Sequence, residues 1–287
     1  MVTPFQVGDS DSLNIQSLRA LVDYLVEGGV QGLLPLGTSG EFALLDQSER
    51  IQVIEAVVDQ ANGRIPVIAG VSAPSTKAAV SYAKHAKDVG ADAVISTGPY
   101  YFTTKESGLS KHFQSIIDAV DIPLLIYNIP GYVGYNIEAS FVARLVEKNP
   151  ESIVGVKVTT YDMKILLEYA AAIGEKISVL TGADALIVPA LSHGAQGAVI
   201  GIANVIPKEC SLLYDNFTHG RIESARTLER TIYPLTQSIG LGTFPSALKE
   251  ALRIVGLECG GVRSPLQDPT DEEKEAVRRS LLWKIQK

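Results

Sequence analysis

The sequence predicts an α/β fold, a (β/α)8 barrel with additional C-terminal helices. Seven short apolar runs recur at intervals of roughly 20 to 32 residues, the length of a strand, a crossover helix and two loops. The runs are apolar throughout, which is typical of parallel strands covered on both faces. Amphipathic stretches with apolar residues at helical spacing separate them. With a short strand at the N-terminus, the chain holds eight β/α repeats and therefore favours a TIM barrel.

The predicted strands follow one another through the first 202 residues. They are residues 2–3, 32–36, 65–69, 93–96, 123–127, 153–157, 177–181 and 198–202. A doubly wound sheet is the alternative to a barrel. That fold usually carries a Gly-x-Gly-x-x-Gly motif after its first strand, and the motif is absent here.

Helices are predicted between the strands, for example over residues 17–26, 47–60 and 76–89. Asp46, with Glu49 three residues later, indicates a capping box at the start of the second. Beyond the last strand, the helical stretches are residues 228–239, 245–255 and 271–283. We expect residues 1–206 to form the barrel, and residues 207–287 to supply its last helix and a C-terminal appendage within one structural unit.

The composition excludes several classes of function. The net charge of −7 disfavours binding to nucleic acid, which needs a basic surface. No apolar run is long enough for a membrane span, and the first residues do not resemble a signal peptide, so we expect a cytoplasmic protein. Two cysteines and four scattered histidines lack the spacing of a disulfide framework or a metal site. We expect neither a metal nor a cofactor.

Two residues at neighbouring strand ends are the strongest candidates for chemistry, which in a barrel sits at the C-terminal ends of the strands. Lys157 is enclosed in an apolar run, where a charged ammonium is costly to bury, and a neutral amine can attack a ketone to form a Schiff base. Tyr127 ends the preceding strand, and its hydroxyl can move protons. The structural alternatives are a lysine that reaches solvent or a carboxylate, and an aromatic ring that closes the barrel.

Further candidates follow other strands. In Gly37-Thr38-Ser39-Gly40-Glu41, two glycines let the backbone approach a ligand, and the amide groups of Thr38 and Ser39 can hold a carboxylate. The alternative is a turn that caps the next helix. Tyr101, in Gly98-Pro99-Tyr100-Tyr101, can line a site or contact another subunit. Gly182 and Ile200, at the last two strands, are candidates for the substrate pocket. His85 and His112 fall within predicted helices and are more typical of packing or surface positions.

Together these motifs resemble the dihydrodipicolinate synthase / N-acetylneuraminate lyase family of Schiff-base aldolases, over nearly the whole chain. The motifs that carry the resemblance are Thr3-Pro4-Phe5, Gly37-Thr38-Ser39-Gly40-Glu41, Pro99-Tyr100-Tyr101, Tyr127-Asn128-Ile129-Pro130, Gly155-Val156-Lys157, Thr181-Gly182-Ala183-Asp184, Gly194-Ala195-Gln196-Gly197 and Val262-Arg263-Ser264-Pro265-Leu266.

The resemblance implies a role for each matched residue. Lys157 would form the Schiff base with pyruvate, and Tyr127 would relay protons at the new carbon–carbon bond. Thr38 would link Tyr127 to Tyr101 of a neighbouring subunit, and the amides of Thr38 and Ser39 would hold the substrate carboxylate. The resemblance also implies a homotetramer built as a dimer of dimers.

Two positions depart from the synthases of this family. Those enzymes usually carry an arginine two residues after the proline of the Tyr-Asn-x-Pro motif, where it binds the carboxylate of the aldehyde substrate. Here that position is Tyr132, which cannot form a bidentate pair with a carboxylate but can donate a hydrogen bond to a hydroxyl. Val158 stands where many relatives carry an acidic residue.

These departures favour a lyase that cleaves a 2-keto-3-deoxy sugar acid to pyruvate and an aldehyde. Three alternatives stay open. The first is a dihydrodipicolinate (4-hydroxy-tetrahydrodipicolinate) synthase that condenses pyruvate with aspartate semialdehyde. The second is an N-acetylneuraminate or 4-hydroxy-2-oxoglutarate lyase. The third is a non-catalytic barrel that binds a keto acid.

Overall fold

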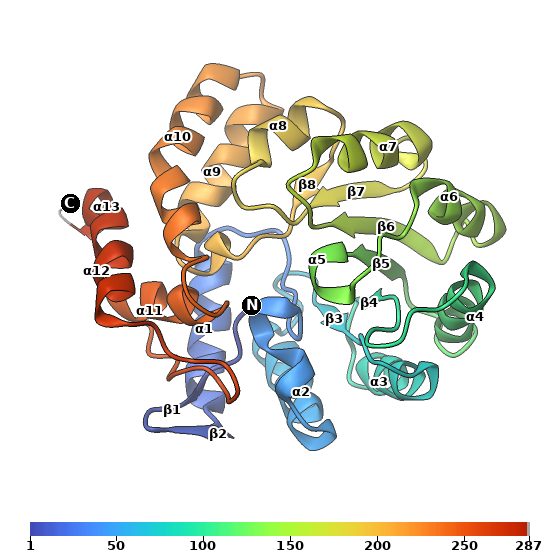
Figure 1. The fold of residues 1–287 in the computed structure, drawn as a ribbon, viewed down its shortest axis with the longest axis horizontal. Helices are drawn as coiled ribbons and strands as arrows, with labels where there is room; N and C mark the ends of the chain where they lie inside the picture. Colours follow the sequence, from blue (N-terminus) through green and yellow to red (C-terminus); the bar gives the residue numbers. More distant parts are fainter. Residues whose placement is uncertain (286–287) are drawn as a thin grey trace. The chain divides into compact units, whose positions relative to one another are not determined.

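Six parallel strands, each hydrogen-bonded to the next in chain order, form the main sheet (Figure 1). The computed structural model describes residues 1–285. It shows two compact units, which we describe separately. The first unit comprises residues 1–67 and the chain from residue 201 onward, and the second comprises residues 68–200.

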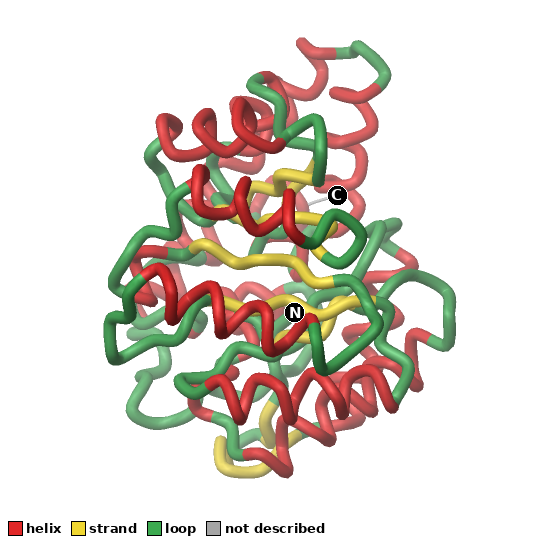
Figure 2. Tube along the Cα trace, turned by 90° about the vertical axis from the view of Figure 1, so that its right-hand side faces the viewer, coloured by secondary structure: helices red, strands yellow, loops and turns green. Residues whose placement is uncertain are grey.

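The second unit alternates strands with helices. Its strands are β3 (Ile68–Gly70), β4 (Ala93–Thr97), β5 (Leu124–Asn128), β6 (Ile153–Val158), β7 (Ser178–Thr181) and β8 (Gly197–Ala198). Its helices are α3 (Thr76–Asp88), α4 (Glu106–Ile117), α5 (Pro130–Val133), α6 (Ala139–Lys148), α7 (Met163–Ile173) and α8 (Ile187–Ser192). All residues of β4 and β5 are buried, as expected for parallel strands covered on both faces. Figure 2 shows the same alternation, with strands in yellow and helices in red.

The first unit contains a hairpin and the remaining helices. The hairpin strands are β1 (Phe5–Gln6) and β2 (Asp9–Leu13). The helices are α1 (Ile15–Glu27), η1 (Thr38–Gly40), η2 (Phe42–Leu44), α2 (Gln47–Ala61), η3 (Ile202–Asn204), α9 (Pro207–Thr218), α10 (Ile222–Ser238), α11 (Ser246–Ile254), α12 (Asp271–Ser280) and α13 (Leu282–Ile285). None of the helices in residues 1–285 is long and apolar enough to cross a membrane.

Contacts between distant parts of the sequence hold the first unit together. The backbone N–H of Val2 donates to the side-chain oxygen of Asn204 over 3.1 Å. The hydroxyl of Tyr24, on α1, donates to the carbonyl of Val205 over 2.7 Å. The start of the chain is thereby joined to the segment that follows the last strand.

The predicted helices 17–26, 47–60 and 76–89 are confirmed as α1, α2 and α3, and the Asp46–Glu49 capping box is present. The stretches 228–239, 245–255 and 271–283 are confirmed as helical in α10 to α13. The boundary at residues 206 and 207 stays a prediction.

The strand prediction fails in the first unit. Residues 2–3 form no strand, because the N–H of Val2 bonds a side chain and the hydroxyl of Thr3 donates to the carbonyl of Gly40. The run at 32–36 contributes only a single parallel bridge, between Leu33 and Val67. Of the predicted strand 198–202, only Ala198 lies in β8, and Ile202 already begins the 3-10 turn η3. The hairpin is absent from the prediction, because β2 is mostly polar and exposed.

His112 is a packing residue of the second unit. Its ring, on α4, is 1% exposed, and Nδ1 lies 3.0 Å from the hydroxyl oxygen of Thr76. Within residues 1–285, Nε2 has no hydrogen-bond partner. Burial lowers the pKa of His112 to about 4, and the nearby backbone of Thr97 opposes this shift. The ring is therefore neutral in the folded protein at neutral pH.

This burial predicts a pH-dependent loss of stability. A histidine of ordinary pKa in the unfolded chain takes up a proton as the pH falls below about 6.5, whereas folded His112 does so only near pH 4. Above pH 6.5 His112 is neutral in both states and does not reduce stability. As the pH falls from 6.5 toward 4, the free energy of unfolding decreases by at most about 3 kcal/mol. Between pH 7.5 and pH 5.0, the free energy of unfolding measured in urea should decrease less for His112→Asn than for the wild type. Equal drops would contradict the prediction.

Candidate active site

The register of β5 against β6 places Tyr127 beside Lys157. The two residues are paired across the parallel ladder, and both are buried, with 3% and 8% exposed surface. The Nζ atom of Lys157 lies 4.2 Å from the centre of the Tyr127 ring. The structure thus brings together the two residues that the sequence places at neighbouring strand ends.

Lys157 has the surroundings of a nucleophilic amine rather than of an ion pair. It lies within the apolar strand β6, whose neighbours Val156 and Val158 are fully buried. Within residues 1–285, no carboxylate lies within 4.0 Å of its Nζ atom. The amine is therefore available to attack a carbonyl carbon next to the Tyr127 hydroxyl group.

Thr159 joins this pair, although the sequence analysis did not identify it. Its hydroxyl donates a hydrogen bond to the Tyr127 hydroxyl oxygen over 3.3 Å. Its backbone N–H donates to the carbonyl of Asn128 over 2.9 Å, which continues the pairing of β6 with β5. The sequence feature that could have identified Thr159 is its position two residues after Lys157. In an extended segment, this spacing puts both side chains on one side.

Gly182 leaves the space that the lysine and the threonine occupy. A Cβ atom added at this position would lie 1.8 Å from the Thr159 hydroxyl oxygen and 2.9 Å from Cε of Lys157. The backbone N–H of Gly182 donates to the carbonyl of Val158 over 2.8 Å, so the segment cannot retreat without losing this bond. The predicted substrate contact of Gly182 stays a prediction.

Tyr132 lies close enough to Tyr127 for the two phenols to interact electrostatically. It is on the short helix α5, and 63% of its surface is exposed. Partial desolvation raises the pKa of Tyr132, and electrostatic interaction with Tyr127 and Tyr161 raises it further. Tyr132 is therefore a neutral hydrogen-bond donor at pH 7. Tyr161 is a second exposed tyrosine of this group that the sequence analysis missed.

The side chain of Asn128 fixes the segment that carries Tyr132. Its amide nitrogen donates to Asn136 Oδ1 over 2.7 Å, and its oxygen accepts from the N–H of Ile137 over 3.0 Å. Asn128 is fully buried at the end of β5. These two bonds close the loop between residues 128 and 137, so the position of α5 is coupled to the strand that holds Tyr127.

The other predicted site residues belong to different segments of the two units. Tyr101 is 88% exposed, has φ +77° and stacks edge-on against Phe102 at 4.9 Å between ring centres. Thr38 and Ser39 are half-buried in η1 of the first unit. Ile200 ends the second unit, after β8. Their joining with Lys157 in one site stays a prediction, as does the contribution of Tyr101 to a neighbouring subunit.

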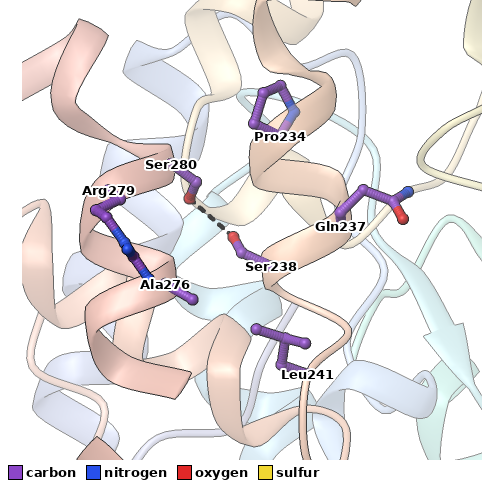
Figure 3. Close-up of a pocket in the computed structure, with 7 residues that line it drawn as sticks. All are labelled: Pro234, Gln237, Ser238, Leu241, Ala276, Arg279 and Ser280. Atoms are coloured by element: carbon purple, nitrogen blue, oxygen red, sulfur yellow. Dashed lines mark hydrogen bonds between the residues drawn. The ribbon is translucent and has the colours of Figure 1, made fainter. Parts of the chain in front are cut away.

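A cavity of ≈ 390 Å³ lies elsewhere, between α10 and α12 of the first unit (Figure 3). Its lining residues are Pro234, Gln237, Ser238, Leu241, Ala276, Arg279 and Ser280. The hydroxyls of Ser238 and Ser280 share a hydrogen bond of 2.8 Å, and each also lies within hydrogen-bonding distance of a carbonyl of its own helix. None of the predicted site residues lines this cavity. Among residues 1–285, no three metal-ligating side chains gather at one place.

Comparison with known proteins defines the class of this site. The profile of the Dihydrodipicolinate synthetase family matches residues 1–283. A 4-hydroxy-tetrahydrodipicolinate synthase of Pelobacter propionicus is 40% identical over 277 residues, which cover 96% of this chain and 94% of that protein.

Two solved structures share the fold. The crystal structure of dihydrodipicolinate synthase from Aquifex aeolicus matches with a TM-score of 0.93 and 33% identity, and covers 98% of this chain and 94% of the other. YagE from E. coli K12, solved in complex with pyruvate, matches with a TM-score of 0.94 and 26% identity over 98% and 95% of the two chains.

A buried lysine beside a tyrosine on parallel strands is the arrangement of an enzyme that forms a Schiff base with a carbonyl substrate. The chain belongs to the dihydrodipicolinate synthetase family, whose members make or break a carbon–carbon bond with pyruvate held as a Schiff base. The predicted family, the predicted enzyme class and the predicted (β/α)8 barrel with additional C-terminal helices are thereby confirmed.

The spacing around Gly182 gives a direct test of the lysine geometry. We expect Gly182→Ala to displace the Lys157 side chain and to reduce turnover by roughly 100-fold, as a misplacement of about 1 Å does in other enzymes. Steady-state kinetics would measure the loss. Gly240→Ala is the matched control, because its added methyl group would lie 3.6 Å from the carbonyl oxygen of Gln237, an ordinary van der Waals contact. Equal rates for both variants would show that the contact with Lys157 is unimportant.

Proposed function

We propose that this protein is a 4-hydroxy-tetrahydrodipicolinate synthase that condenses pyruvate with aspartate semialdehyde. The observation that carries the proposal is the pairing of Lys157 with Tyr127, combined with identities of 32–40% to relatives that bear this name over more than nine-tenths of the chain. These relatives favour the synthase over the cleavage of a sugar acid, which the sequence alone had favoured.

The Lys157–Tyr127 pair supports each bond-making step. The amine of Lys157 attacks C2 of pyruvate, and loss of water gives an imine. Loss of a proton from C3 then gives an enamine, which attacks the aldehyde carbon of the second substrate. Tyr127 supplies the proton to the alkoxide that forms, and Thr159 orients its hydroxyl. The amino group of the condensed product attacks C2, closes the ring and releases Lys157 as the free amine.

A second candidate function rests on Tyr132. A neutral phenol beside Tyr127 suits a hydroxyl group better than a carboxylate, which favours cleavage of a 2-keto-3-deoxy sugar acid to pyruvate and an aldehyde. The same lysine and tyrosine serve this reaction in reverse order. The structure of YagE in complex with pyruvate supports pyruvate as the substrate common to both reactions.

The position in the cell and the assembly are also proposals. We expect the enzyme to act in the cytoplasm as a homotetramer, a dimer of dimers in which Tyr101 of one subunit enters the site of its neighbour. The exposure of Tyr101 and Phe102 supports this assembly, because large aromatic rings are seldom left in water without a partner.

The lysine is tested by removal. Lys157→Ala should form no borohydride-stable adduct with pyruvate and should lose turnover, since no other group supplies the imine nitrogen. Intact-protein mass spectrometry and kinetics would measure both effects. Lys164→Ala is the matched control, because Lys164 is an exposed lysine of the adjacent helix α7. Substantial turnover by Lys157→Ala would refute the assignment.

Two coupled assays separate the candidate reactions. Pyruvate with aspartate semialdehyde, followed with a dihydrodipicolinate reductase, should give a signal for the synthase. Release of pyruvate from a panel of 2-keto-3-deoxy acids, followed with lactate dehydrogenase, should stay at background. The opposite result would establish the lyase.

Replacement of Tyr132 by arginine tests whether a carboxylate of the second substrate lies at this position. Tyr132→Arg should lower the KM for aspartate semialdehyde by roughly tenfold, since a hydrogen bond to a charged group contributes about 1.5–3 kcal/mol. The KM for pyruvate should not change, because pyruvate binds covalently to Lys157 and not to residue 132. A raised KM for the aldehyde would mean that Tyr132 itself binds this substrate.

A further inference from the structure

The residue that follows the Thr38–Ser39 turn is a buried acid in a strained backbone conformation. The side chain of Glu41 has no exposed surface. Its backbone has φ +54° and ψ +31°, a left-handed conformation that costs free energy in residues other than glycine. Such a residue persists only where its surroundings hold it, so the contacts of the carboxylate identify what fixes this turn.

Both carboxylate oxygens of Glu41 are held from the C-terminal part of the first unit. Oε1 lies 2.6 Å from Nζ of Lys249, on helix α11. Oε2 accepts a hydrogen bond from the backbone N–H of Arg263 over 2.8 Å. The sequence had pointed to the segment around Arg263 only as part of the family resemblance.

The two residues that hold Glu41 are themselves immobilised. Nζ of Lys249 donates to the carbonyl of Gly261 over 2.8 Å and lies 4.0 Å from the centre of the Phe5 ring. The guanidinium group of Arg263 lies 4.5 Å from the same ring centre and donates to Glu49 over 2.6 Å. Because Glu49 caps helix α2, the Arg263 segment is fixed to the helix that begins just after the turn.

The backbone transmits this anchoring to the turn. The N–H of Glu41 donates to the carbonyl of Thr38 over 3.1 Å, and the N–H of Gly40 donates to the carbonyl of Gly37 over 3.0 Å. The hydroxyl of Thr3 donates to the carbonyl of Gly40 over 2.7 Å. A change in the orientation of Glu41 would therefore move the peptide groups of Thr38 and Ser39.

The pair of charges is poorly explained by stability alone. Desolvation of two ions in the interior cancels most of their attraction, and apolar replacements of similar volume are often equally stable. A buried ion pair does, however, define position closely, because removal of either partner leaves an uncompensated charge.

We propose that Glu41 is a positioning residue, through which Lys249 and Arg263 hold the Thr38–Ser39 turn in the conformation that receives the carboxylate of the keto acid. The inference rests on the proposed function, since it takes the keto acid to be the substrate of Lys157. It assigns Lys249 and Arg263 to substrate selection although neither touches the substrate.

The test compares two ketones that differ in the carboxylate. Pyruvate and acetone both form an imine with an amine, and borohydride adds hydride to the imine carbon and makes the adduct permanent. The concentration of each ketone that gives half-maximal adduct is measured by intact-protein mass spectrometry. The ratio of the two concentrations reports recognition of the carboxylate and is insensitive to a general loss of active protein.

Glu41→Gln should reduce the preference for pyruvate over acetone by roughly tenfold, the loss of about one charge-assisted hydrogen bond. The amide of Gln has one acceptor oxygen and one NH2 group. One of the two donors that hold Glu41, the Lys249 ammonium or the N–H of Arg263, would therefore face this NH2 group. The half-maximal concentration for acetone should change less than twofold. Glu250→Gln is the matched control. Glu250 is a buried acid on α11, the helix that carries Lys249, and it pairs with Arg253 rather than with Lys249. This variant should keep the wild-type preference.

The double variant Glu41→Gln with Lys249→Met covers a failure of the single variant to fold, because it leaves no unpaired buried charge. It should show the same reduced preference. A folded variant with the wild-type ratio would overturn the inference while the proposed function stands. A wild-type protein that forms no adduct with pyruvate would overturn the proposed function, and the inference with it.

Discussion

Backbone hydrogen bonding between β5 and β6 is the constraint on which the chemistry of this protein depends. The parallel ladder pairs Tyr127 with Lys157, and one residue of slippage would turn either side chain to the opposite face of the sheet. The flanking strands β4 and β7 fix the ladder from both sides, since Thr97 pairs with Tyr127 and Leu180 with Lys157. The geometry of the amine and the phenol is therefore set by the rigid part of the second unit.

The loops after these strands adapt the same pair to a substrate. Asn128 closes the segment after β5, which carries Tyr132. After β7, Gly182 lets the backbone lie close to Lys157 and Thr159. The family forms a Schiff base with pyruvate, and in the proposed function Lys157 and Tyr127 carry this step. Tyr132 and Tyr161 are exposed tyrosines that interact electrostatically with each other, and Tyr132 also interacts with Tyr127.

In the first unit, a polar turn is attached to an apolar interior through buried charged groups. Its N-terminal segment contributes the fully buried ring of Phe5, and its C-terminal segment contributes Lys249 and Arg263, whose cationic groups lie against that ring. The carboxylate of Glu41 compensates the charge of Lys249, and the carboxylate of Glu49 compensates that of Arg263. Helix α11 and the segment around Arg263 therefore hold the residue that ends the Thr38–Ser39 turn.

Local pattern and family motifs in the sequence determined the fold class and the helices, and they predicted Lys157 and Tyr127 at neighbouring strand ends, where the register pairs them. Helical periodicity and caps such as Asp46 act within a few residues, so the sequence shows them directly. The hairpin β1–β2 was missed because its second strand is mostly polar and exposed. The hydrogen bond from Thr159 and the ion pair between Glu41 and Lys249 were decided only by tertiary structure. Each depends on which distant segments meet: the pairing of Lys249 with Glu41 joins the two ends of the sequence, and no short-range pattern encodes such a contact. The failure at residues 2–3 has the same cause, because Val2 and Thr3 satisfy their polar groups with Asn204 and Gly40 rather than with a neighbouring strand.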